Sequence, residues 1–177
     1  MRHARRVITQ TFLYYGAFQL SVALHRSIAP SDNLDIARIV DLSHGLRVIL
    51  AWVYGLISIS YLAPISFLTH WGLFDERQSI IQLLGLPLFG LVCTPLVFEF
   101  ANRLGVDLRL KRGYMINWYN VVSIGLIASS ADALGCKLIT GSSYKLMLVD
   151  LGGNLAGMTL GIGVLRLGLG IIRNLTP

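Results

Sequence analysis

Charged residues are scarce in this sequence. Asp, Glu, Lys and Arg make up 14% of the 177 residues, whereas 54% are hydrophobic. An ordinary soluble domain carries about 25% charged residues, so this composition excludes that class. The mean hydropathy of +0.65 points the same way. The chain is therefore expected to be an integral membrane protein.

Cysteines and catalytic motifs are also scarce. The two cysteines, Cys93 and Cys136, lie in apolar segments without a Cys-x-x-Cys pair, which gives no basis for a disulfide framework or a metal site. There is no P-loop, no serine-nucleophile loop and no His-Glu-x-x-His helix. The net charge of +6 comes without basic stretches interleaved with aromatics. We therefore predict no enzymatic activity, no cofactor, no metal and no nucleic-acid partner.

Long apolar runs are what the sequence does contain. A helix needs about 20 apolar residues to cross roughly 30 Å of hydrocarbon. These runs are continuous rather than alternating, which favours helices over a barrel. Five reach this length, the first interpreted as an uncleaved span: 7–24, 48–69, 80–101, 118–138 and 146–172. We predict an all-α, polytopic single domain over 1–177 with five to six membrane segments.

The distribution of Lys and Arg conflicts with five simple crossings. With the N-terminus inside, the basic cluster at 103–112 falls outside, against the positive-inside rule. Either an outside N-terminus or a segment 48–69 that enters and leaves on one side restores the rule. Gly55 and Pro64 interrupt this segment, and broken helices are tolerated where protein covers them. We favour a broken or re-entrant helix at 48–69, with both termini on the cytoplasmic side of the inner membrane.

Ionisable residues inside or beside these runs form the candidate functional site. A charge at the membrane centre costs at least about 2.5–3.5 kcal/mol on insertion scales, so it tends to have a partner or a function. The favoured topology brings four such side chains to one depth: His44, Arg47, Asp132 and Asp150. They are interpreted as a pocket for a small ligand or a proton. The alternative is an internal ion pair, Arg47 with Asp150 or Lys137 with Asp132.

Other polar residues extend this cluster. Ser129, Ser130 and Asn154 lie within one helical turn of the aspartates and are able to add hydrogen bonds. The histidines lack the spacing of a helical chelate, so they predict no metal centre.

Small residues repeat along the last run. Gly153, Gly157 and Gly161 follow one another at intervals of four, a spacing that lets helix backbones approach closely. This face is predicted to pack against another helix of the chain or, as the alternative, against a second copy or a membrane protein partner.

Two stretches resemble the membrane-associated sensor domain known as MASE1. One is Asp41-Leu-Ser-His-Gly-Leu-Arg47 running into VILAWVYG and then YLAPISFLTH. The other is Leu148-Val-Asp-Leu-Gly-Gly153, which is similar to the family's Asp-x-x-Gly turn. The resemblance implies a membrane module that senses or binds a small molecule, with Asp150 as the residue carried over.

The predicted function is a non-enzymatic membrane module that senses or binds a small ligand through the polar cluster. The alternative is a small substrate-capture or accessory subunit of a larger membrane transporter or complex. The expected partners are the lipid bilayer and a membrane protein, or a second copy that docks on the Gly-rich last helix.

Overall fold

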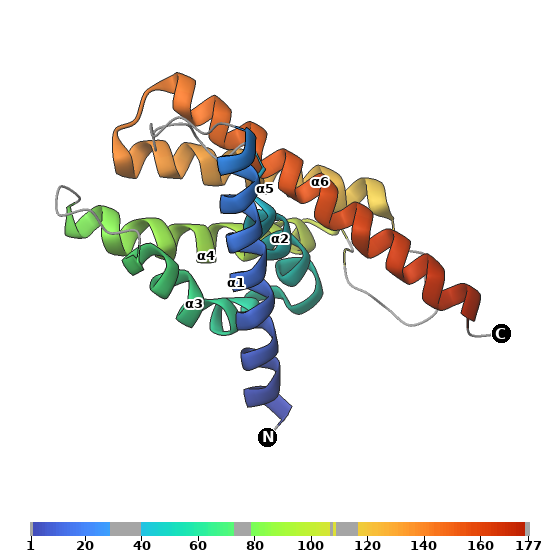
Figure 1. Cartoon of the computed structure of the whole chain (residues 1–177). Coiled ribbons are helices and arrows are strands. Elements are labelled where there is room, and N and C mark those ends of the chain that lie inside the picture. The colour runs from blue at the N-terminus through green and yellow to red at the C-terminus, as the bar shows by residue number, and fades with distance from the viewer. Residues whose placement is uncertain (1, 29–39, 73–78, 107, 109–116, 176–177) are drawn as a thin grey trace.

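The computed structural model describes residues 2–28, 40–72, 79–106, 108 and 117–175. Within these ranges the chain forms helices and turns, and no strand. The helices are α1 (Arg2–Ile28), α2 (Leu42–Tyr54), the short 3-10 helix η1 (Gly55–Ile57), α3 (Ser58–Gly72), α4 (Ile80–Arg103), α5 (Trp118–Thr140) and α6 (Tyr144–Leu175). The predicted all-α class is confirmed. Figure 1 shows α5 lying beside both α4 and α6, with α1 crossing over α2 and α3.

Local capping residues explain where several helices begin and end. Asp41 caps α2 by accepting a hydrogen bond from the backbone N–H of His44. Ser79 opens α4 with a capping box, and Asn117 caps α5. Gly141 ends α5 in the left-handed conformation that glycine adopts without strain. These side chains satisfy backbone groups that a helix end would otherwise leave unpaired.

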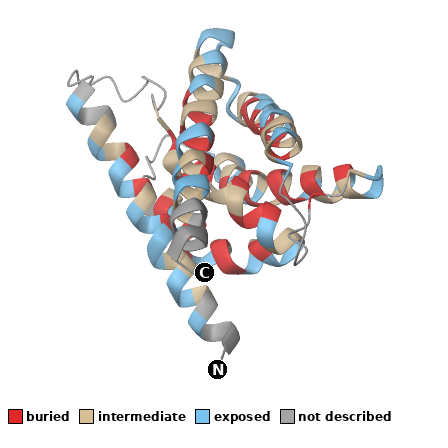
Figure 2. Ribbon diagram, turned by 90° about the vertical axis from the view of Figure 1, so that its right-hand side faces the viewer, coloured by how far each residue is buried: buried red, intermediate tan, exposed pale blue. Residues whose placement is uncertain are grey.

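Four helical segments are long and apolar enough to cross a membrane: Leu42–Trp71, Ile80–Arg103, Trp118–Thr140 and Tyr144–Gly168. A helical membrane protein is therefore supported, whereas five to six segments are not confirmed. The difference lies in α1, which covers the first predicted span but is not among the four. Gln10 and Gln19 lower the apolar character of that helix. Figure 2 shows buried positions on the inward faces of the helices and exposed positions on the outer ones.

The segment predicted to be broken is interrupted at Gly55. This glycine has φ 59° and ψ −140°, a conformation that residues with a Cβ rarely adopt. One 3-10 turn follows, and α3 then runs in a different direction from α2 (Figure 1). The rings of Tyr54 and Tyr61 meet edge to face across the break, with centroids 5.2 Å apart. The break thus lies inside the predicted range 48–69.

Helix α2 is the centre of the fold. Val48 and Trp52 on one side join the hydrophobic cluster with α4, α5 and α6. Leu50 on another side joins a second cluster formed with α1, α3 and α4. Both hydrophobic clusters contain residues of α2, so packing on two sides holds this short helix in place. The polar first turn of α2 is thereby held in place as well.

Helix α2 begins in the interior of the helix bundle. The backbone N–H of Asp41 donates to the carbonyl of Gly153 at 2.9 Å. Gly153 is nine residues beyond the start of α6 at Tyr144, which places it about 13 Å along that helix at 1.5 Å per residue. At its other end, α2 places Trp52 against Trp118, the first residue of α5, with ring centroids 5.7 Å apart. Helix α2 therefore spans only the half of the bundle remote from the α5–α6 turn.

Candidate functional site

The polar first turn of α2 meets polar side chains of α5 and α6. Asp132 on α5 is the centre of this group and has 3% of its surface exposed. Its Oδ2 lies 3.5 Å from Nη2 of Arg47 and 3.4 Å from Nδ1 of His44. The side-chain amide of Asn154 on α6 donates to the same oxygen at 3.2 Å. We call His44, Arg47, Asp132, Asn154, Asp41 and Ser129 the polar cluster.

A second carboxylate, that of Asp41, completes the surroundings of the guanidinium. Oδ2 of Asp41 lies 3.7 Å from Nη2 of Arg47. Oδ1 of Asp41 accepts hydrogen bonds from the hydroxyl of Ser43 and from the backbone N–H of His44. Arg47 thus lies between two carboxylates, one on its own helix and one on α5. A buried charge in this setting is balanced by partners on both sides.

Glycines make the room that this arrangement needs. A Cβ added to Gly90 on α4 would lie 2.2 Å from Nη1 of Arg47, so the missing side chain leaves space for the guanidinium. A Cβ on Gly157 would lie 1.8 Å from the carbonyl oxygen of Asp41, and one on Gly45 would lie 2.2 Å from the carbonyl oxygen of Gly157. The start of α2 therefore touches α6 backbone to backbone.

Four buried side-chain atoms of this region have no hydrogen-bond partner among the described residues: Nδ1 of His44, Nε of Arg47, Oγ1 of Thr94 and Oδ1 of Asp132. The contact between His44 and Asp132 is within ion-pair distance but is not a formed hydrogen bond. Thr94 is fully buried and lies one turn beyond Gly90 on α4. Donors and an acceptor are therefore left over on Arg47 and Asp132, which contact each other, and Thr94 adds a hydroxyl on the next turn of α4.

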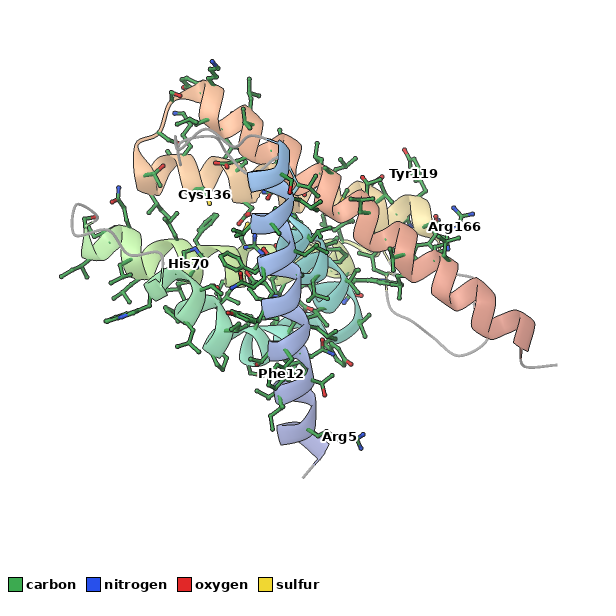
Figure 3. All side chains as sticks on the ribbon, in the orientation of Figure 1. Arg5, Phe12, His70, Tyr119, Cys136 and Arg166 are labelled. Carbon is green, nitrogen blue, oxygen red and sulfur yellow. The ribbon has the colours of Figure 1, made fainter. Side chains whose placement is uncertain are left out.

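The polar cluster lies well inside the membrane-length helices. Asp132 precedes the end of α5 at Thr140 by eight residues, or about 12 Å at 1.5 Å per residue. Asn154 follows the start of α6 at Tyr144 by ten residues, or about 15 Å. In Figure 3, Cys136 marks the turn of α5 beyond Asp132, whereas Tyr119 lies toward the far end of the bundle. The cluster is thus remote from both ends of α5.

Three of the four predicted site residues come together: His44, Arg47 and Asp132. Asp150 is half-buried on α6, one turn before Asn154. The described carboxylate partners of Arg47 are Asp132 and Asp41, and the predicted pair of Arg47 with Asp150 stays a prediction. The start of α2 docks further along α6, at Gly153 and Gly157, and this position brings the guanidinium to Asp132 on α5.

The alternative prediction, an ion pair of Lys137 with Asp132, is corrected. Its ammonium lies 3.8 Å from the centroid of the Tyr144 ring, a cation–π contact near the α5–α6 turn. Lys137 is five residues beyond Asp132, so its side chain leaves α5 on a different face. Asp132 pairs with Arg47 instead.

The predicted glycine face lies against α2 of the same chain. Gly153 accepts the hydrogen bond from Asp41, and a Cβ on Gly157 would collide with the backbone of that residue. A Cβ on Gly161 would lie 3.2 Å from the side chain of Ile49. This face is therefore covered within the chain.

Asp41 and Gly90 are site residues that the sequence analysis missed. Asp41 precedes Leu42-Ser43-His44 as a helix N-cap, and the preference of Asp for that position was the available signal. No sequence pattern marks Gly90 as a site residue. Only the packing of α4 against Arg47 shows that its missing Cβ leaves room for the guanidinium. Among the described residues, no group of three His, Cys, Asp or Glu side chains is placed to hold a metal ion.

A separate cleft of about 290 Å³ lies at the other end of α2. It is lined by Trp52, Gly55, Phe98, Glu99 and Asn102 among others. The polar cluster and this cleft are at opposite ends of one helix.

No protein family model, curated protein or solved structure matches this chain.

Proposed function

We propose that this chain is an integral membrane protein that senses or binds a small polar ligand at the polar cluster. The observation that carries the proposal is the set of unpartnered buried atoms on His44, Arg47, Thr94 and Asp132. Buried polar atoms are nearly always hydrogen-bonded in folded proteins, and each one that is not costs about 1–3 kcal/mol. An internal ion pair alone gives no reason for unpartnered atoms on both Arg47 and Asp132.

The chemistry of the unpartnered atoms restricts the ligand. The N–H of Arg47 and the hydroxyl of Thr94 are donors, and Oδ1 of Asp132 is an acceptor. A ligand that both accepts and donates hydrogen bonds pairs with all of them. The polar atoms lie in apolar surroundings, so a small molecule with a polar end fits better than a highly charged one. The resemblance of 41–47 to a sensor domain supports the same function.

Native mass spectrometry of the detergent-purified protein tests ligand binding. We expect a non-lipid small molecule that stays bound to the wild type and is lost from Asp132→Asn. Glu99→Gln is the matched control, because Glu99 pairs with Arg103 on its own helix at 3.3 Å, away from the cluster. Equal retention in both variants, or no retained molecule in the wild type, would refute binding at the cluster.

We further propose that α2 is a half-helix and that η1 and α3 complete a re-entrant unit in the inner membrane, with α1 as a fifth segment. Both termini then lie in the cytoplasm, and the α5–α6 turn lies outside. Single cysteines test this in a background without Cys93 and Cys136. Arg5→Cys and Arg103→Cys should react with an impermeant maleimide only from the cytoplasmic side, and Ser142→Cys only from outside. The reverse pattern would refute the topology.

A second candidate function is an accessory or substrate-capture subunit of a larger membrane complex. It is favoured by a face of α6 that the described residues leave open, because among them a Cβ on Gly152 or Gly163 would meet nothing within 4 Å. A partner or second copy on the last helix would use this face rather than the covered one. Gly163→Leu should then weaken a complex that survives mild detergent, as size-exclusion chromatography with light scattering would show. An unchanged monomer in both proteins would exclude homo-oligomers.

A further inference from the structure

The polar cluster contains an ordered chain of three side chains. The Oγ of Ser129 lies 2.9 Å from Nε2 of His44, and Nδ1 of His44 lies 3.4 Å from Oδ2 of Asp132. The two nitrogens of one imidazole thus face a hydroxyl on one side and a carboxylate on the other. His44 and Ser129 have no exposed surface. The order is hydroxyl, imidazole, carboxylate.

An imidazole between a serine hydroxyl and a carboxylate is able to act as a general base. The carboxylate orients the ring and stabilises the imidazolium that forms when the ring takes the hydroxyl proton. Such arrays are recognised by geometry and roles, because they recur on unrelated folds in different chain orders. The longer contact, between His44 and Asp132, is of the kind that tightens when substrate binds.

Ser129 differs from other hydroxyls on these helices. A helical hydroxyl commonly donates to the carbonyl four residues earlier, as Ser21, Ser130 and Thr159 do. The described hydrogen bond of Ser129 joins it to His44 instead. Ser130, the next residue, is exposed and donates to its own helix at 3.0 Å. The chain therefore supplies a matched serine next to the unusual one.

The polar cluster and the neighbouring turn of α4 hold donors that an acyl-transfer reaction needs. Attack on a carbonyl places negative charge on oxygen, and nearby N–H or O–H groups that stabilise this charge supply much of the catalysis. The Nε of Arg47 and the hydroxyl of Thr94 are buried without a hydrogen-bond partner among the described residues. They are the candidates for that role.

We propose that Ser129 is the nucleophile of an acyl-transfer reaction on a carboxylic ester, with His44 as general base and Asp132 as the residue that positions the imidazole. Oγ attacks the ester carbonyl carbon while its proton passes to Nε2 of His44. The bond from that carbon to the alcohol oxygen breaks, and the alcohol leaves with the proton. Water then attacks the acyl-serine with the same base, which releases the carboxylic acid and regenerates Ser129.

The surroundings indicate the class of ester. Ser129 precedes the end of α5 by eleven residues, or about 16 Å along the helix. Its neighbour Ala128 and the facing Val48 on α2 are fully buried and apolar. An ester with an apolar acyl chain fits this setting. The inference rests on the proposed function, because the ester must first bind at the polar cluster.

This inference departs from the sequence-based prediction of a non-enzymatic protein. That prediction relied on the absence of linear catalytic motifs. His44 and Ser129 are 85 residues apart, so no local pattern joins them.

Reaction of the detergent-purified full chain with a long-chain alkyl fluorophosphonate tests the nucleophile. Oγ of an activated serine displaces fluoride from phosphorus, and peptide mass spectrometry identifies the modified residue. We expect one phosphonyl group for each chain, on Ser129. Ser130→Ala should react at the wild-type rate and Ser129→Ala should not react. His44→Gln should react at least about 100-fold more slowly, which is the contribution typical of a general base.

The positioning role of Asp132 has its own readout. Asp132→Glu should recover part of the reaction rate that Asp132→Asn loses, although both variants disturb packing. Mapping of the modified site on the wild type does not depend on the folding of any variant. A wild type that stays unmodified while folded, or that is modified equally at Ser130, would overturn the proposal. A molecule retained in native mass spectrometry by such an unreactive protein would leave ligand binding intact and remove only the reaction.

Discussion

Replacing Gly157 by alanine is expected to separate the start of α2 from α6. The added Cβ would lie 1.8 Å from the carbonyl oxygen of Asp41 and 2.3 Å from its carbonyl carbon. An ordinary contact begins at 3.4 Å. The colliding atoms belong to backbone, so no side-chain rotation relieves the contact. Helix α2 must move as a unit, or its first turn must unwind.

The magnitude follows from two losses and one gain. Overpacking of this kind costs about 1–3 kcal/mol. The displacement also breaks the buried 2.9 Å hydrogen bond from Asp41 to Gly153, which costs about 1–3 kcal/mol. Alanine regains about 1 kcal/mol relative to glycine through its helix preference. We therefore expect the free energy of unfolding to fall by about 1–5 kcal/mol.

The assay is reversible unfolding in mixed micelles of dodecyl maltoside and SDS, followed by tryptophan fluorescence. Gly152→Ala is the matched control, because it lies on the same helix and its Cβ would meet nothing within 4 Å. This variant should unfold like the wild type or up to about 1 kcal/mol less readily. If Gly157→Ala is as stable as Gly152→Ala, α2 does not touch α6 at this point and the depth assigned to the polar cluster is wrong.

Three further predictions concern the cluster and the helix break, all measured by the same unfolding assay. Asp132→Asn should lower the free energy of unfolding by about 3–5 kcal/mol because it removes a partner of buried Arg47. Adding Arg47→Met to the same chain should recover part of this loss. Strict additivity of the two changes would mean that the residues do not interact. Gly90→Ala places a Cβ 2.2 Å from Nη1 of Arg47, whereas in the control Gly85→Ala the nearest atom to the new Cβ lies at 3.6 Å. Gly90→Ala should therefore lower the free energy of unfolding by about 1–3 kcal/mol more than Gly85→Ala does. Equal costs would place the guanidinium elsewhere. Gly55→Ala should cost about 1–3 kcal/mol because of its φ of 59°, and a neutral effect would mean that α2 continues into α3 without this break.

Composition alone predicted a helical membrane protein, and the reason is general. Hydrocarbon requires each backbone polar group to be paired within the protein, so a continuous apolar run of sufficient length predicts a helix without reference to neighbours. The break in the 48–69 segment was predictable for a similarly local reason. Gly55 adopts a backbone conformation that residues with a Cβ rarely adopt. Gln10 and Gln19 reduce the apolar character of α1, and this helix is not among the four that are long and apolar enough to cross a membrane.

Only the tertiary structure decided which polar side chains meet. Helical spacing gives the depth of a residue on its own helix, but it does not give the point at which another helix docks. The backbone contacts at Gly153 and Gly157 determine that α2 begins about 13–20 Å along α6 from Tyr144. This position brings Arg47 to Asp132 and sets His44 between Ser129 and Asp132. Sequence identified the charged residues in the membrane, whereas packing of glycine against backbone selected their partners.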